Sequence, residues 1–108
     1  MKECQVDLHG YDVLGALELA ELRVQEAFEN GYATVELLHG AGDVAEPVEK
    51  GRGRIKWALR RLVEEGRFYG YCLPDRTWLK AGSIVLYLKP NPRPRREIWA
   101  PEPHRPYR

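Results

Sequence analysis

The sequence has no apolar run that approaches the roughly 20 residues needed to cross a lipid bilayer. Its start, MKECQVD, lacks the apolar core of a signal peptide. Cysteine is scarce, since Cys4 and Cys72 are the only two and they form no CxxC pattern. We interpret them as free thiols in a reducing compartment, although two cysteines would permit a disulfide. These absences predict a cytoplasmic protein without a membrane-spanning segment.

Residues that degrade on heating are also few. Met occurs once, Asn and Gln occur twice each, and charged residues make up 31% of the chain. This composition favours a thermophilic source. A chain of 108 residues is long enough for one domain with an apolar core of its own. Nothing in the sequence demands more than a monomer.

Basic residues are nearly absent from the first part of the chain. Residues 1–49 hold 11 acidic residues against Lys2 and Arg23, which is a net charge of −9. Residues 50–67 carry a net charge of +5, and the chain from Lys89 onward carries +4. Segregated charge of this kind predicts a polyanion as partner, bound on one side of the molecule. A solvated helix face with a soluble tail would explain the same pattern.

The hydrophobic pattern predicts the element order βαβαββ. The expected strands cover residues 4–9, 32–38, 67–73 and 83–88, and the expected helices cover residues 13–29 and 53–65. Asp12 is the expected N-cap of the first helix, and Asn30-Gly31 is its expected end. The residues expected to face inward are Leu14, Leu17, Ala20, Val24 and Phe28 in the first helix, and Ile55, Leu59, Leu62 and Val63 in the second.

This order predicts an α/β fold, a two-layer sandwich in which a mixed four-stranded sheet is covered by two helices. The first two strands would be parallel, because a helix connects them. Six of the 8 prolines follow residue 89, so that segment can neither pair in a sheet nor continue a helix. We therefore expect a domain over residues 1–89 and an extended or disordered Pro/Arg-rich tail over 90–108, pinned by Ile98 and Trp99.

Two histidine-glycine pairs end predicted strands, in VDLHG (6–10) and LLHGAG (37–42). The carboxyl ends of parallel strands meet at one edge of a sheet, so Asp7, His9 and His39 should lie together. An Asp beside a His fixes its tautomer and favours its charged form, and a His suits proton transfer near neutral pH. Alternatively, His9 caps a turn and Asp7 binds the amides of the Gly10 turn.

A phosphate-binding region is predicted beside these strand ends. Glycines in HGAG let the backbone approach a ligand, and successive free N–H groups there could cradle an anion. Cations in the first turn of the second helix oppose the helix dipole, which a bound phosphate would explain. The candidate residues are Gly40, Gly42, Arg52, Arg54, Lys56 and Arg60. Alternatively, Arg54 and Lys56 form weak ion pairs with acidic residues of the 39–52 loop.

A metal site is a further alternative, because Asp7, His9 and His39 are residue types that bind transition metals. Their spacing fits no strong metal signature, so the sequence favours proton transfer. It leaves open whether a divalent metal such as Mg²⁺ or Mn²⁺ takes part.

The motifs together resemble the Smr (small MutS-related) domain family, in a stand-alone form. The resemblance covers roughly residues 5–88 and rests on VDLHG (6–10), HGAG (39–42) and GRIK (53–56), the last at the start of the second helix. It implies a fold similar to the C-terminal domain of a bacterial translation initiation factor. Two positions depart from the family pattern: Lys56 stands where the family has Arg, and LKAGSIV has a single glycine, Gly82.

The resemblance implies a nuclease that nicks or cleaves DNA or RNA, in DNA repair or recombination or in ribosome quality control. By that resemblance, Asp7 and His9 are the catalytic residues, and His39, Gly40 and Gly42 are the second part of the site. The nucleic acid, and with it the ribosome, is the expected partner. A module that binds nucleic acid or the ribosome without cleavage is the second hypothesis. A protein-interaction module that uses the Pro-rich tail is the third.

Overall fold

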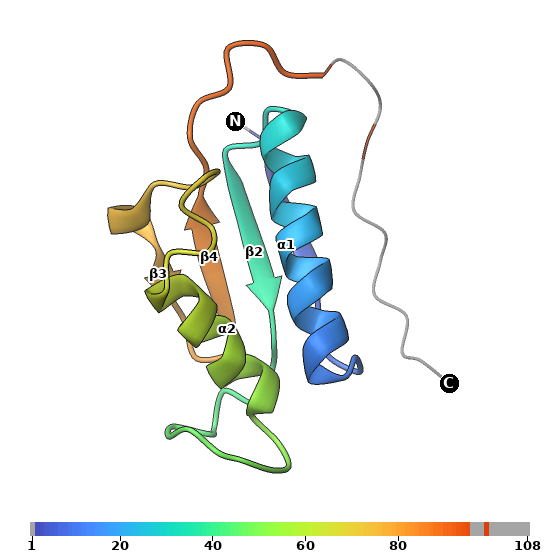
Figure 1. Ribbon diagram of the computed structural model, residues 1–108, viewed down its shortest axis with the longest axis vertical. Coiled ribbons are helices and arrows are strands. Elements are labelled where there is room, and N and C mark those ends of the chain that lie inside the picture. Colours follow the sequence, from blue (N-terminus) through green and yellow to red (C-terminus); the bar gives the residue numbers. More distant parts are fainter. Residues whose placement is uncertain (1, 96–98, 100–108) are drawn as a thin grey trace.

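The computed structural model describes residues 2–95 and Trp99. Its elements are β1 (Glu3–Asp7), α1 (Val13–Glu29), β2 (Thr34–Leu38), α2 (Arg54–Glu64), the 3₁₀ helix η1 (Pro74–Arg76), β3 (Trp78–Leu79) and β4 (Ser83–Tyr87). The sheet has the order β1-β2-β4-β3, with β1 parallel to β2 and β4 antiparallel to both of its neighbours. Both helices lie side by side on one face of the sheet (Figure 1). The predicted α/β fold with a mixed four-stranded sheet is confirmed.

The predicted ends of α1 are also confirmed. The Asp12 carboxylate accepts a hydrogen bond of 2.7 Å from the backbone N–H of Gly15, which satisfies one of the free amides of the first turn. At the other end, the backbone N–H of Asn30 donates to Glu26, and Gly31 takes a positive φ of 79°. Neither helix of the described region has the length and hydropathy to cross a bilayer.

The face of α1 that packs against the sheet consists mainly of small residues. Ala16, Ala20, Val24 and Ala27 are buried in the core, and α1 contacts β1 and β2. The expectation that Leu14 faces the core is wrong, because Leu14 is 66% exposed. Leu14 precedes Ala16 by two residues, which places it about 200° around the helix from the buried stripe. The expected inward face of α2 is confirmed, since its apolar residues belong to the core or pack against it.

The prediction of a strand over residues 67–73 is wrong. The chain turns there instead, and the Phe68 carbonyl accepts hydrogen bonds from the amides of Tyr71 and Cys72. Within this segment, Cys72 alone pairs with the sheet, through an isolated antiparallel β-bridge to Leu88. Phe68 and Cys72 are both buried, so the apolar pattern of this segment reflects packing in the core rather than pairing in the sheet. The remaining strand is β3, which follows η1 and pairs with β4.

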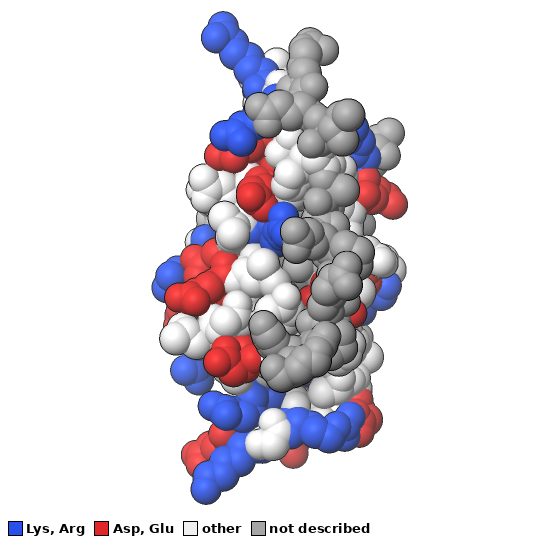
Figure 2. All heavy atoms as spheres, turned by 90° about the vertical axis from the view of Figure 1, so that its right-hand side faces the viewer, with Lys and Arg blue, Asp and Glu red and all other residues white. Residues whose placement is uncertain are grey.

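Charge is unevenly distributed over the folded molecule. On the face shown in Figure 2, Lys and Arg side chains form a belt near the lower end, where Figure 1 places the loop over residues 39–53. Lys50, Arg52 and Arg54 are exposed there, but Figure 2 shows acidic side chains among them. The loop contributes the exposed acidic residues Asp43, Glu46 and Glu49, so this end carries charges of both signs in three dimensions.

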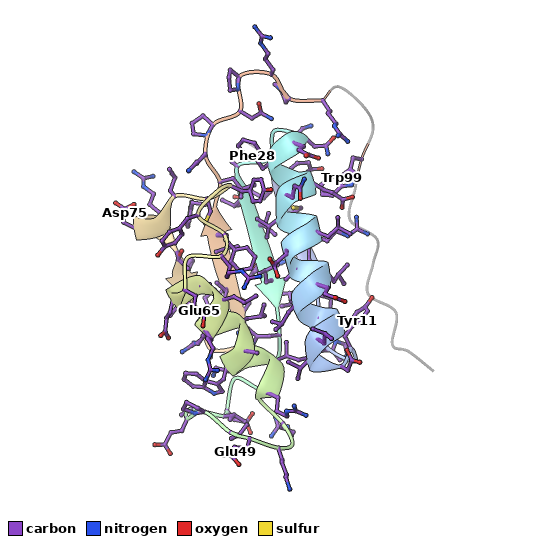
Figure 3. All side chains as sticks on the ribbon, in the orientation of Figure 1. Tyr11, Phe28, Glu49, Glu65, Asp75 and Trp99 are labelled. Carbon is purple, nitrogen blue, oxygen red and sulfur yellow. The ribbon has the colours of Figure 1, made fainter. Side chains whose placement is uncertain are left out.

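The first part of the tail packs on the end of α1. The Asn91 side chain donates to the Phe28 carbonyl at 2.9 Å, and the Arg95 amide donates to the Glu29 carbonyl at 2.9 Å. Trp99 lies beside α1 (Figure 3) and meets Tyr32 edge to face, with the ring centroids 5.3 Å apart. The predicted contact through Trp99 is confirmed, whereas Ile98 lies outside the described residues.

Candidate active site at the ends of two parallel strands

Asp7 and His9 form a hydrogen-bonded pair at the end of β1. The last pair of the parallel register joins Asp7 to Leu38 of β2, and the Leu8 amide extends the ladder to the Leu38 carbonyl. His9 Nδ1 lies 2.9 Å from Asp7 Oδ1. The same carboxylate oxygen also accepts the backbone N–H of His9 at 3.1 Å. Both roles considered from the sequence are therefore present. The Asp7 carboxylate binds a backbone amide of the turn, and it also orients the imidazole of His9.

The environment of the pair suits proton transfer. The His9 side chain is 61% exposed and the Asp7 side chain 32%. When Nδ1 carries the proton and donates it to Asp7, Nε2 is the basic nitrogen of the ring. The carboxylate also stabilises the imidazolium that forms when Nε2 takes up a proton.

His39 follows β2 and occupies a different environment, because it is only 4% exposed. Its Nδ1 lies 2.7 Å from the Gly40 carbonyl, so Nδ1 is the protonated nitrogen. Among the described residues, its buried Nε2 has no hydrogen-bond partner. Burial lowers the pKa of His39, the neighbouring Lys56 and Arg60 lower it further, and the hydrogen bond to Gly40 opposes them. His39 is therefore held neutral, with Nε2 able to accept a proton or hydrogen bond.

The two histidines line one hollow of about 290 Å³. Tyr11, the chain that leads into α2, and the first residues of α2 complete its wall. The convergence of the two strand ends, predicted from the sequence, is thus present in the fold. Asp7 contributes to this hollow through its bond to His9.

The HGAG turn is fastened to the connection between β3 and β4. The backbone N–H groups of His39 and Gly40 both donate to the Gly82 carbonyl, at 3.1 and 3.0 Å. The expectation of free amides that cradle an anion is therefore wrong for these two groups. Gly42 packs against the same connection, because a Cβ added to it would lie 3.1 Å from the carbonyl carbon of Ala81. The turn thus needs glycine here for backbone packing.

Three of the four predicted basic residues have partners within the protein. Arg52 forms two hydrogen bonds with Asp43, at 2.7 and 2.9 Å, and this contact lowers the pKa of the Asp43 carboxyl to about 2. Lys56 is buried and donates to the Val44 carbonyl at 2.9 Å. Arg60 donates to the Lys80 carbonyl at 3.2 Å. Lys56 and Arg60 thus hold the loop and the β3–β4 connection in place around the histidines.

Arg54 differs from these three residues. It is exposed, lines the same hollow as both histidines, and has no hydrogen-bond or ion-pair partner among the described residues. The pairing with an acidic loop residue, considered from the sequence, occurs at Arg52 and not at Arg54. Arg54 is therefore placed to contact an anionic ligand.

Gly53 was not predicted from the sequence as a site residue. It precedes α2 with a φ of +91°, and a Cβ added there would lie 2.7 Å from the Val44 side chain. Its conformation sets the direction in which α2 starts and hence the position of Arg54. A glycine as the first residue of the predicted helix was the signal available.

A metal centre is not preformed at this site. Within the described part of the chain, no group of three or more His, Cys, Asp or Glu side chains is arranged to hold a metal ion. Whether a divalent metal takes part, which the sequence leaves open, is decided by measuring cleavage with EDTA, Mg²⁺ or Mn²⁺.

The fold and the hollow define a small two-layer α/β domain with two histidines at adjacent ends of parallel strands. The chain belongs to the Smr domain family, which residues 6–89 match. It is similar to the crystal structure of the Smr domain of Thermus thermophilus MutS2, with a TM-score of 0.56 and 24% identity. That likeness covers 83% of this chain and 100% of the other, and at this identity it shows the fold alone. No curated protein matches the sequence.

Proposed function

We propose that this Smr domain is a cytoplasmic endonuclease that hydrolyses phosphodiester bonds in DNA or RNA. Family membership supports nucleic acid as the ligand. The observation that carries the proposal is the hollow itself, where an Asp-oriented histidine, a neutral buried histidine and an unpaired arginine come together. The two free cysteines are consistent with a reducing compartment.

In the proposed reaction, His9 Nε2 accepts a proton from the water that attacks phosphorus. A new P–O bond forms to that water oxygen while the bond to the leaving oxygen breaks. Asp7 stabilises the imidazolium of His9, and that imidazolium returns the proton to the leaving oxygen. His39 provides a second acid-base or phosphate-contacting group through its unpartnered Nε2.

Arg54 is proposed to stabilise the negative charge that develops on the phosphoryl oxygens. The guanidinium is suited to this because it can bind two phosphate oxygens at once. Gly40, Gly42, Arg52, Lys56 and Arg60 are proposed to act indirectly, since the contacts described above use them to shape the loop.

The test is a cleavage assay on supercoiled plasmid and on labelled RNA, each with EDTA, Mg²⁺ or Mn²⁺. We expect the wild type to cleave one substrate and the Asp7→Ala/His9→Ala variant to lose about 10²-fold or more, as for a missing acid-base group. The matched control is Asp75→Ala, on exposed η1, which should cleave like the wild type. Equal cleavage by wild type and double variant would refute the assignment.

A second candidate function is binding of nucleic acid or the ribosome without cleavage. The exposed Lys and Arg side chains near the lower end in Figure 2 favour it, because such cations attract a polyanion whether or not chemistry follows. In that case, salt-sensitive binding would be present in the Asp7→Ala/His9→Ala variant and cleavage would be absent from the wild type.

A further inference from the structure

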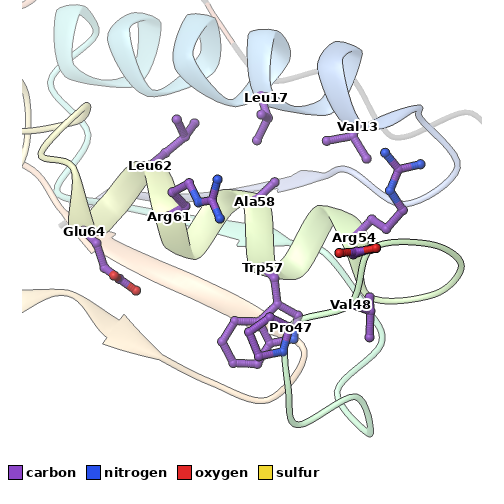
Figure 4. Close-up of a pocket in the computed structure, with 11 residues that line it drawn as sticks. Val13, Leu17, Pro47, Val48, Arg54, Trp57, Ala58, Arg61, Leu62 and Glu64 are labelled. Carbon is purple, nitrogen blue, oxygen red and sulfur yellow. The ribbon is translucent and has the colours of Figure 1, made fainter.

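A second hollow, of about 530 Å³, is lined by α1, by α2 and by Pro47, Val48 and Glu49 of the loop, and one part of it lies where α1 faces α2. It adjoins the candidate active site, because Val13 and Arg54 line both hollows. Figure 4 shows Val13 and Leu17 of α1 pointing towards α2, with Ala58 on the facing side of α2. We call this hollow the interhelical groove.

The two walls of the interhelical groove differ in chemistry. Val13 and Leu17 make the α1 wall apolar, whereas Arg54 and Arg61 extend from α2 towards α1 (Figure 4). The two arginines are separated by two helical turns, about 10 Å along the helix axis. Neither guanidinium group has a hydrogen-bond or ion-pair partner among the described residues. The groove therefore offers an apolar wall opposite two available guanidinium groups.

Two carboxylates, Glu49 and Glu64, line the groove together with the two arginines, so its lining has no net charge. Neither carboxylate forms an ion pair with Arg54 or Arg61 among the described residues, and the Glu64 carboxylate points away from α1 in Figure 4. The two guanidinium groups are therefore available to an anion on the side of the groove that faces α1.

We propose that the interhelical groove binds an unpaired, single-stranded segment of nucleic acid beside the phosphate that is cleaved. This inference rests on the proposed function and names the substrate class of the same site. An unpaired nucleotide exposes an apolar base face together with its phosphates, which matches the two walls. A duplex keeps its base faces stacked inside and would leave the apolar wall without a partner. An acidic amphipathic peptide has comparable chemistry, but the shared boundary with the histidine-lined hollow favours the nucleic acid.

The test measures binding of a fluorescent single-stranded oligonucleotide and of its duplex by anisotropy in EDTA. We expect the wild type to bind the single strand about tenfold or more tightly than the duplex. Arg61→Ala should weaken single-strand binding several-fold and reduce the slope of log K against log salt by about 0.7, as for one lost phosphate contact. Ala58→Glu places a negative charge between the two arginines, and Glu is compatible with the helix. This variant should weaken single-strand binding further than Arg61→Ala.

The matched control is Arg76→Ala, a basic residue of η1 outside the groove, which should bind like the wild type. Equal affinity for duplex and single strand, or an effect of Arg61→Ala no larger than that of Arg76→Ala, would overturn the inference. The inference would also be overturned if the protein bound an acidic peptide in the groove and did not bind the oligonucleotide. Circular dichroism verifies that each variant is folded.

The two proposals fail separately. If cleavage depends on Asp7 and His9 but single-strand binding and cleavage do not depend on Arg61, the nuclease proposal is supported. The proposal that the interhelical groove binds a single strand is then contradicted. Arg61-dependent binding of the single strand by a protein that cleaves nothing would support the groove and contradict the nuclease.

Discussion

At the scale of the residue, the two histidines of the hollow have different environments. His9 is open to solvent and bonded to a carboxylate, whereas His39 is buried near two cations. The environment of His39 favours its neutral ring, because burial and the nearby cations lower its pKa. One site thus contains an exposed imidazole oriented by a carboxylate and a buried imidazole held neutral, two different groups for acid-base chemistry.

The lowered pKa of His39 predicts a pH-dependent stability. The unfolded chain takes up a proton at His39 as the pH falls through about 6.5, whereas the folded protein resists it until a lower pH. The free energy of unfolding should therefore be highest above that value and fall on acidification. In urea titrations at pH 7.5 and 5.5, His39→Gln should lose less stability on acidification than the wild type. An equal loss in both proteins would contradict this prediction.

The convergence of Asp7, His9 and His39 could be predicted from the sequence, because it requires only two parallel strands and the residues at their ends. The role of Lys56 could not. Lysine is rarely buried, and its acceptor, the Val44 carbonyl, exists only once the loop is folded. Nor does any sequence signal mark the Gly82 carbonyl as the group that fixes the second motif.

At the scale of the element, the loop over residues 39–53 determines where α2 begins. Gly51 and Gly53 both have positive φ angles, of 82° and 91°, but only Gly53 is crowded by a neighbour. The loop therefore contains two glycines with the same backbone requirement and different packing.

This pair supports a matched test. Gly51→Ala should cost about 1–2 kcal/mol, the penalty for a left-handed non-glycine residue. Gly53→Ala should cost more, because its Cβ would also lie 2.7 Å from the Val44 side chain. Chemical unfolding of both variants measures the difference. Equal destabilisation would show that the contact with Val44 relaxes without cost.

The long elements were predictable from the sequence and the short ones were not. The cap at Asp12, the stop at Asn30-Gly31 and the apolar face of α2 are strong local signals, and they predicted both helices within a residue or two. β3 has only two residues, too few to show a period. The segment over 67–73 has the composition of a strand, but its turns bury Phe68 and Cys72 in the core and leave Tyr69 exposed.

At the scale of the whole molecule, the described residues of the tail, 90–95 and Trp99, lie away from the histidines. They contact the end of α1 and Tyr32 just before β2, whereas the hollow lies where β1 and β2 end. Trp99 makes an aromatic contact with Tyr32 and a cation–π contact with Arg23. These residues therefore contribute to stability at a distance from the proposed chemistry.

Trp99→Ala should lower the free energy of unfolding by about 1–2 kcal/mol, less than for a fully buried tryptophan, because the side chain is half-buried. Trp78→Ala is the control, because Trp78 is 56% exposed and should cost less. Urea unfolding measures both. Cleavage by Trp99→Ala at a temperature where it is folded should equal that of the wild type. A selective loss of cleavage would place the tail in the proposed mechanism.

The attachment of the HGAG turn to Gly82 has a consequence for the order in which the protein is made. His9 and His39 both precede β4 in the chain, and β2 is a central strand that pairs with β4. Until Gly82 has been synthesised and β4 pairs, its carbonyl does not hold the amides of His39 and Gly40. A nascent chain that lacks β4 thus carries the residues of the site without its geometry, and the site is assembled only after β4 has left the ribosome.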